Sequence, residues 1–240
     1  PDSGMKNETP ETIARQRLNL IRALMHKHEV TALLVTSAPN RRYLSGFTGS
    51  AGNLLITPDR AILFTDFRYR LRSAAEAPDF ELCEISHEQP FSQRLVEFAK
   101  ELALAHLAFE SHHVTVAQHT AWAKALHDEL GAAMPELKPT NGLVESLRRR
   151  KHSSELATLR QAVALTDETI TAVLPQLRPD HTERQAAWML EREMRERGAH
   201  SVAFPIIVAA GPNAAMPHAE PGDTPLGTGR TIIIDMGAVY

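Results

Sequence analysis

The sequence places one acidic side chain directly after an apolar run. Residues 231–234 read Thr-Ile-Ile-Ile, and Asp235 follows them. Four apolar or β-branched residues in succession predict a strand that is buried on both faces. A carboxylate that leaves such a strand is costly to bury unless it is paired or binds a metal ion. Asp235 is therefore a candidate metal ligand or catalytic carboxylate, and the ordinary alternative is an aspartate that caps the next turn.

A histidine in a proline-rich loop is the second candidate. Residues 211–221 read Gly-Pro-Asn-Ala-Ala-Met-Pro-His-Ala-Glu-Pro and lie between two predicted strands. Pro217 and Pro221 restrict the backbone on either side of His218. A histidine held in a stiff loop near an acid-bearing strand end can bind substrate or transfer protons. The alternative is a surface histidine that takes no part in chemistry.

Two further motifs favour structural roles. Residues 46–52 carry glycine at every third position, but they lead into a predicted strand instead of opening a helix. That order argues against a phosphate-binding loop and favours a tight loop in which backbone segments approach closely. Asp66 follows a predicted strand and precedes a helix, where its side chain is placed to cap the helix.

Composition limits the class of protein. The formal net charge of −3 over 240 residues argues against binding to nucleic acid. No apolar run approaches the ~18 residues that span a bilayer, so no membrane partner is expected. The single cysteine, Cys83, cannot form an internal disulfide and fits a buried core position in a cytoplasmic protein.

The first part of the chain alternates strands with helices, which predicts an α/β domain. Its sheet should be mixed, because residues 53–57 and 61–65 form a hairpin around a Pro-Asp-Arg turn. The other predicted strands are residues 32–36, 80–85 and 107–110, and the predicted helices are residues 69–76, 91–102 and 116–130. Residues 134–142 contain two prolines and a glycine and predict a domain boundary, so the first domain covers residues 5–140.

The second domain, residues 141–240, has a different pattern. A long helix is predicted at residues 155–174, and Thr182 with Gln185 forms a capping box that opens a second helix running to Gly198. Strands at residues 202–209 and 231–234 follow, which indicates an α+β domain. The last strand would be left with an unpaired edge, so we expect this domain to be incomplete.

Four segments together resemble the creatinase/prolidase/aminopeptidase P group of metallopeptidases. Residues 40–50, Asn-Arg-Arg-Tyr-Leu-Ser-Gly-Phe-Thr-Gly-Ser, and residues 65–69, Thr-Asp-Phe-Arg-Tyr, are similar to signatures of the family's N-terminal domain. Residues 147–162 are similar to its domain-joining segment. The spacing between His218 and Asp235 matches the spacing between the family's substrate-site histidine and its first metal-binding aspartate.

The resemblance implies a creatinase/prolidase-like N-terminal domain, used in dimer contacts and in closing off the active site, followed by a pita-bread domain. It implies two divalent metal ions, usually manganese, cobalt or zinc, and peptide substrates with proline in the second position. Asp235 would be a metal ligand, and His218 would be a catalytic residue that contacts the substrate and steadies the tetrahedral intermediate. The activity would be that of an Xaa-Pro aminopeptidase in a cytoplasmic homodimer.

In the family, a second aspartate, a histidine and two glutamates follow the first metal-binding aspartate. Their positions come later in the chain than Tyr240, the last residue of this sequence. One carboxylate cannot hold a dinuclear centre, so we expect a truncated chain that is inactive and binds no metal by itself. Three other functions stay open. They are an Xaa-Pro dipeptidase, a creatinase-type amidinohydrolase and a non-catalytic pita-bread binding module.

Overall fold

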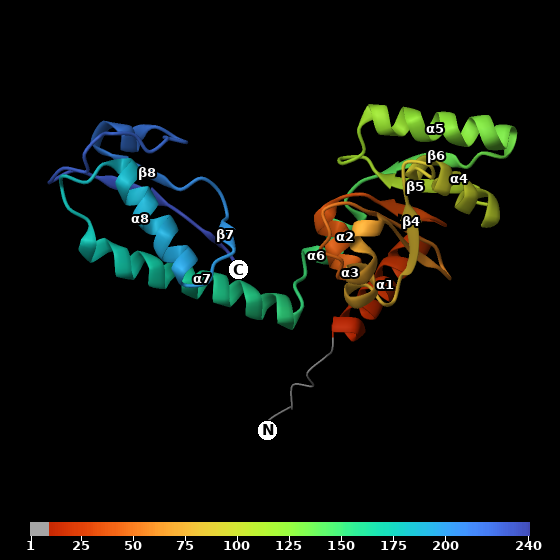
Figure 1. Cartoon of the computed structure of the whole chain (residues 1–240), viewed down its shortest axis with the longest axis horizontal. Coiled ribbons are helices and arrows are strands. Elements are labelled where there is room, and N and C mark those ends of the chain that lie inside the picture. The colour runs from red at the N-terminus through yellow and green to blue at the C-terminus, as the bar shows by residue number, and fades with distance from the viewer. Residues whose placement is uncertain (1–9) are drawn as a thin grey trace, which may run out of the picture. The chain divides into compact units, whose positions relative to one another are not determined.

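The computed structural model describes residues 10–240, so the predicted start of the first domain at residue 5 lies outside the described residues. The chain divides into two compact units, one that ends at Arg150 and one that begins at Lys151 (Figure 1). Among the described residues, no helix is long and apolar enough to cross a membrane.

The first unit is an α/β domain built on a six-stranded sheet with the order β4-β3-β2-β1-β5-β6. β2 runs antiparallel to β1 and β3, and the other pairs are parallel, which confirms the predicted mixed sheet and its hairpin. The strands are β1 (Leu33–Val35), β2 (Asn53–Ile56), β3 (Ala61–Asp66), β4 (Glu81–Ile85), β5 (His106–Glu110) and β6 (Glu136–Thr140). The helices are α1 (Pro10–Lys27), α2 (Ala38–Ser45), α3 (Arg70–Glu76), α4 (Phe91–Glu101), α5 (Val116–Leu130) and α6 (Leu143–Arg148), with short 3₁₀ turns η1 (Phe67–Tyr69) and η2 (Gly131–Ala133).

Helices cover both faces of this sheet. Successive residues of a strand point to opposite faces, so Leu33 and Val35 pack with α1, α2 and α6, whereas Leu34 packs with α4 and α5. The two apolar clusters explain why β1 is an unbroken apolar run, as in strands that are buried on both faces. Cys83 packs into the cluster under α4 and α5, which confirms its predicted core position.

The boundary between the units comes later than the sequence pattern predicts. Residues 136–140 form β6, which pairs in parallel with β5 although it contains Pro139. A proline is tolerated there because β6 is an edge strand. α6 follows and buries Val144 in the cluster that contains α1, and Arg148 donates a 2.8 Å hydrogen bond to Asn40 Oδ1. The division therefore lies after Arg150 instead of after residue 140.

The second unit packs two helices against two short pairs of antiparallel strands. The helices are α7 (Ser153–Val173) and α8 (Glu183–Glu196), with 3₁₀ turns η3 (Leu174–Gln176) and η4 (Gly211–Ala215). The strands are β7 (Ser201–Val202), β8 (Ile207–Ala210), β9 (Ile232–Asp235) and β10 (Ala238–Val239). β8 pairs with β9, and β7 pairs with β10. Leu165 and Val173 of α7, Leu190 and Met194 of α8, and Val208 of β8 form the centre of its core.

In the second unit, one predicted local feature is confirmed and another is wrong. Thr182 and Gln185 form the predicted capping box at the start of α8. The predicted strand at residues 202–209 is wrong as a single element, because it is divided into β7 and β8 around Pro205. Proline has no N–H with which to continue a ladder. Ala203 N–H still donates to Gly237 O at 2.8 Å, so the two strand pairs are linked across the break.

Candidate active site

Asp235 lies at the end of β9, where it stands opposite Ile207 of β8. Ile234 packs against the core of the second unit, and side chains alternate along a strand, so Asp235 projects from the opposite face of the pair. Asp235 is exposed, as are Ile232 at 36% and Ile233 at 45% of their full surface. The expectation of a strand buried on both faces is therefore wrong. α7 and α8 cover only one face, and the acid stands on the open one.

His218 lies in the long connection between β8 and β9, residues 211–231, as the sequence predicts. We call residues 211–227 the His218 loop. The imidazole is exposed, and the backbone of His218 has a φ of 59°, in the left-handed region. A residue other than glycine is uncommon in this region, and such strain persists only where the surroundings enforce it. The loop must therefore be held in shape from outside His218 itself.

The residue that holds the loop is Glu183, at the first turn of α8. Its side chain is only 1% exposed. Glu183 Oε1 accepts hydrogen bonds from Ala210 N–H at 2.8 Å and from the Asn213 side-chain amide at 2.9 Å, and Oε2 accepts one from Gly222 N–H at 3.0 Å. Burial alone would raise the pKa of Glu183, but these hydrogen bonds outweigh it and lower the pKa, so the carboxylate is charged near neutrality.

Sequence reasoning did not single out Glu183. A glutamate at the first position of a helix, directly after an N-cap threonine, is expected to be exposed and to interact favourably with the helix dipole. Nothing in its local pattern distinguishes a surface glutamate from a buried one. The sequence offers one indication of Glu183, which is that the start of this helix precedes a long loop containing a candidate histidine.

The structure does not bring His218 and Asp235 into direct contact. Within residues 10–240, no hydrogen bond or salt bridge joins the two side chains. An exposed carboxylate is a suitable oxygen donor for a divalent ion. However, the described residues contain no group of three His, Cys, Asp or Glu side chains that could hold a metal ion. A complete metal centre therefore does not fit the described residues alone.

The glycine-rich segment at residues 46–52 is a tight loop, as predicted. A Cβ added to Gly46 would lie 2.7 Å from Glu76 O, and one added to Gly52 would lie 2.9 Å from Phe64 O. The buried guanidinium of Arg41 fastens the loop from inside, because it donates 2.5 Å hydrogen bonds to the carbonyls of Gly49 and Gly52. The loop is thus shaped by close backbone contacts, and its carbonyls point at a cation.

Asp66 is a helix cap, as its position in the sequence predicts. Its carboxylate accepts a 3.1 Å hydrogen bond from Arg68 N–H, and Arg68 Nε donates to the same oxygen at 2.8 Å. The side-chain hydrogen bonds from Arg68 lower the pKa of Asp66. These contacts are complete within the turn, so Asp66 is not a candidate for chemistry.

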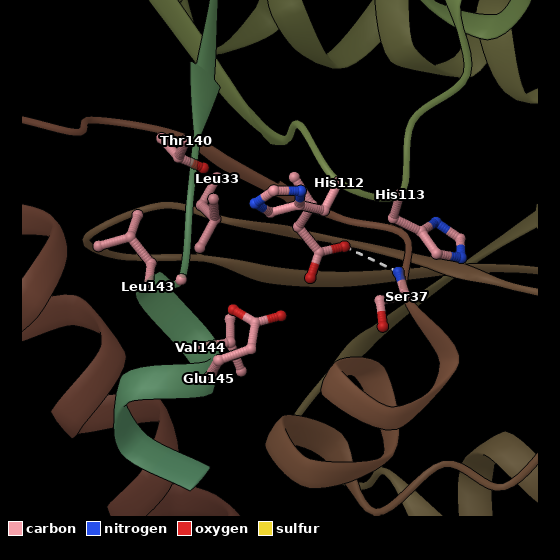
Figure 2. Close-up of a pocket in the computed structure, with 10 residues that line it drawn as sticks. Leu33, Ser37, His112, His113, Thr140, Leu143, Val144 and Glu145 are labelled. Carbon is pink, nitrogen blue, oxygen red and sulfur yellow. Dashed lines mark hydrogen bonds between the residues drawn. The ribbon is translucent and has the colours of Figure 1, made fainter. Parts of the chain in front are cut away.

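A hollow of about 140 Å³ lies in the first unit near the ends of β5 and β6 (Figure 2). Glu110 is buried beside it. One carboxylate oxygen of Glu110 accepts hydrogen bonds from the N–H groups of Thr36 at 2.6 Å and Ser37 at 2.7 Å. The other oxygen accepts one from the Asn40 side-chain amide at 2.5 Å. Donors from the protein thus already surround this carboxylate.

Asn40 extends the same network to α6. Its amide also donates to Glu145 Oε1 at 2.5 Å, and its Oδ1 accepts from Arg148 at 2.8 Å. Figure 2 shows Glu145 on α6, and His112 and His113 on the segment after β5, around the hollow. These hydrogen bonds hold α6 against the sheet. We therefore interpret the hollow as part of the structural contact between α6 and the sheet.

Comparison with known families agrees with this architecture. Residues 17–150 match the model of the creatinase/prolidase N-terminal domain, and residues 157–240 match the model of metallopeptidase family M24. The first match alone covers more than half of the chain. The chain therefore belongs to the creatinase/prolidase/aminopeptidase P group of metallopeptidases, which confirms the predicted resemblance.

Individual relatives extend the likeness along the chain. The uncharacterized peptidase YqhT of Bacillus subtilis is 32% identical over 224 residues, which are 93% of this chain and 61% of the relative. The structure of an Xaa-Pro dipeptidase from Bacillus anthracis is 32% identical, with a TM-score of 0.87 over 95% of this chain and 61% of that one. An X-Pro aminopeptidase from Thermotoga maritima MSB8 is 28% identical, with a TM-score of 0.80 over 91% and 61% of the two chains.

These structures confirm the predicted fold class, in which a mixed-sheet N-terminal domain is followed by part of a pita-bread domain. The chain spans 61% of the length of each of these three relatives. The match to family M24 includes both His218 and Asp235, since it covers residues 157–240.

Proposed function

We propose that the protein carrying this chain is an Xaa-Pro aminopeptidase, a metal-dependent exopeptidase that releases the N-terminal residue of peptides with proline in the second position. The observation that carries the proposal is the match of residues 157–240 to metallopeptidase family M24, with Asp235 exposed on the open face of β9. The likeness to an X-Pro aminopeptidase from Thermotoga maritima supports the specificity.

In this proposal Asp235 would supply an oxygen ligand to one of two divalent ions, which would be manganese, cobalt or zinc. The chemistry that such a centre supplies is activation of water and polarisation of the scissile carbonyl. Such a centre needs ligands besides Asp235, and the described residues hold no group of three suitable side chains. This chain would therefore be inactive and metal-free by itself.

His218 has the second role in the proposal. Its exposed imidazole contacts the substrate and stabilises the charge of the tetrahedral intermediate. A donor helps the reaction most when it is already aimed at the developing charge, because no reorganisation is then needed. The hydrogen bonds that hold the His218 loop to Glu183 support this role.

The proposal extends to assembly and location. The protein would be a homodimer that uses the first unit in dimer contacts, and it would act in the cytoplasm. One buried free cysteine and no disulfide in the described residues fit a reducing compartment. The oligomeric state is measured by light scattering of the purified protein.

An Xaa-Pro dipeptidase is the second candidate, supported by the likeness to the Bacillus anthracis dipeptidase. The deciding experiment compares a dipeptide Xaa-Pro, a tripeptide Xaa-Pro-Yaa and the matched tripeptide Xaa-Ala-Yaa, each with added manganese. Faster cleavage of Xaa-Pro-Yaa than of both others supports the aminopeptidase. Cleavage of the dipeptide alone replaces it with the dipeptidase. Turnover of creatine would indicate an amidinohydrolase. If the protein carrying this chain shows none of these activities, that result would indicate a binding module.

A further inference from the structure

Glu183 is a buried carboxylate whose hydrogen-bond donors are all uncharged. They are the N–H groups of Ala210 and Gly222 and the side-chain amide of Asn213. A charge that is taken out of water is costly unless such contacts compensate for it. A helix cap alone does not require this burial, because Thr182 already provides one as the N-cap of α8. The burial of Glu183 is therefore not explained by its place at the start of the helix.

Two of the donors, Asn213 and Gly222, lie on opposite arms of the His218 loop, and the third, Ala210, is the last residue of β8, directly before the loop. Ala210 and Asn213 precede His218 in the chain, and Gly222 follows it. Around the same carboxylate, Glu183 N–H donates to Thr224 O at 3.0 Å, and the Asn213 amide donates to Thr224 Oγ1 at 3.2 Å. One side chain thus closes the segment from residue 213 to residue 222 into a ring, with His218 between the two fixed points.

The backbone of His218 gives this closure a direct consequence. With a φ of 59°, His218 is in a conformation that an unconstrained loop would leave. Releasing either arm lets the backbone relax to a negative φ, which redirects the imidazole. The direction of the imidazole should therefore depend on the buried carboxylate of Glu183, which holds both arms.

We propose that Glu183 is a positioning residue that acts through His218, with its buried carboxylate closing both arms of the loop so that the imidazole is held toward the substrate. This inference rests on the proposed function for the role of His218. It assigns Glu183 no contact with substrate or metal.

The test uses Glu183→Gln, which keeps the shape of the side chain. The glutamine oxygen can still accept from one arm, but its NH₂ group meets an N–H donor on the other arm and cannot accept from it. Glu220→Gln is the matched control, because Glu220 is exposed in the same loop. Hydrogen exchange of residues 211–227, measured by mass spectrometry, should be at least tenfold faster in E183Q than in E220Q or the wild type. Unchanged exchange in folded E183Q would overturn the proposal.

Kinetics of the protein carrying this chain separate positioning from a general structural role. With an Xaa-Pro peptide, E183Q should lower kcat by about 10- to 100-fold with little change in KM, because a misplaced group mainly weakens transition-state contacts. In a His218→Ala background the same substitution should change kcat by less than about twofold, since its effect passes through His218. Equal losses in both backgrounds would contradict the proposal.

Two outcomes keep the inference separate from the proposed function. If the wild-type protein cleaves no Xaa-Pro peptide, the proposed function fails, whereas the exchange experiment still decides whether Glu183 orders the loop. If E183Q does not fold, Asn213→Ala removes one donor and leaves the carboxylate in place. That variant should speed exchange in the same residues by a smaller factor, and unchanged exchange would again overturn the proposal.

Discussion

The Glu183 carboxylate accepts a hydrogen bond from Gly222 N–H at 3.0 Å, across a separation of 39 residues in the sequence. This contact joins the first turn of α8 to the far arm of the His218 loop. Since the near arm is bound to the same carboxylate through Asn213, the order of the loop depends on the charge of one side chain.

The first prediction concerns pH. The pKa of Glu183 is lowered in the folded protein, so its stabilisation is complete above the pKa of an unfolded glutamate, about 4.3. It is lost as the pH falls through the lower, folded-state pKa. At pH 7, the free energy of unfolding of E183Q should be about 2 kcal/mol lower than that of the wild type. This difference should shrink toward zero in acid, because a protonated glutamate resembles glutamine. Urea titrations at several pH values measure it, and a difference that grows in acid would contradict the account.

The second prediction concerns strain at His218. Replacing His218 with glycine should remove the cost of its left-handed backbone, which exceeds the added chain entropy of glycine. We expect H218G to raise the free energy of unfolding by roughly 0.5–1 kcal/mol while lowering kcat by about 10²- to 10³-fold. Ala103→Gly is the matched control, because Ala103 has a φ of 45° and lies in the other unit. It should gain stability and keep activity. Destabilisation by H218G would mean that the imidazole makes stabilising contacts.

The third prediction concerns Arg41 and the glycine loop. Arg41→Met removes two hydrogen bonds and leaves the carbonyls of Gly49 and Gly52 without their donor. The first unit should lose roughly 3 kcal/mol of stability. The adjacent Arg42 is exposed, so Arg42→Met should change stability by less than about 0.5 kcal/mol. Thermal unfolding of both variants checks this, and equal shifts would show that the Arg41 contacts contribute little.

The fourth prediction tests the end of the first unit. A protein ending at residue 150 should be more stable than one ending at residue 140 by at least about 3 kcal/mol, since only the longer one keeps α6. α6 contributes buried Val144 and the hydrogen bond from Arg148 to Asn40. Urea unfolding of both proteins measures the difference. Equal stability would place the boundary after residue 140.

Much of the fold could be predicted because it is written in local patterns. The β2–β3 hairpin follows from its turn residues, α5 has the predicted bounds, and Thr182 with Gln185 caps α8 as expected. β6 could not be predicted from its sequence, because only its place at the sheet edge makes its proline, Pro139, acceptable.

The candidate site was harder to predict in physical terms. His218 and Asp235 were found through spacing and residue type, and their chemical roles stay predictions. The exposure of β9 depends on which face α7 and α8 cover, which an apolar run does not encode. The role of Glu183 depends on hydrogen bonds with residues that are 27 to 39 positions away in the sequence, so a local pattern cannot reveal it.

The most direct test of Asp235 as a metal ligand is a metal titration of activity in the whole protein that carries this chain, with Asp235→Asn and Asp223→Asn side by side. Asp223 is an exposed aspartate in the same unit and serves as the control. Each protein is stripped with a chelator and titrated with manganese while cleavage of an Xaa-Pro peptide is followed. We expect the wild type and D223N to recover activity, and D235N to recover less than about 1% of it, because one ligand is lost. Full recovery by D235N would contradict the assignment of Asp235 as a metal ligand.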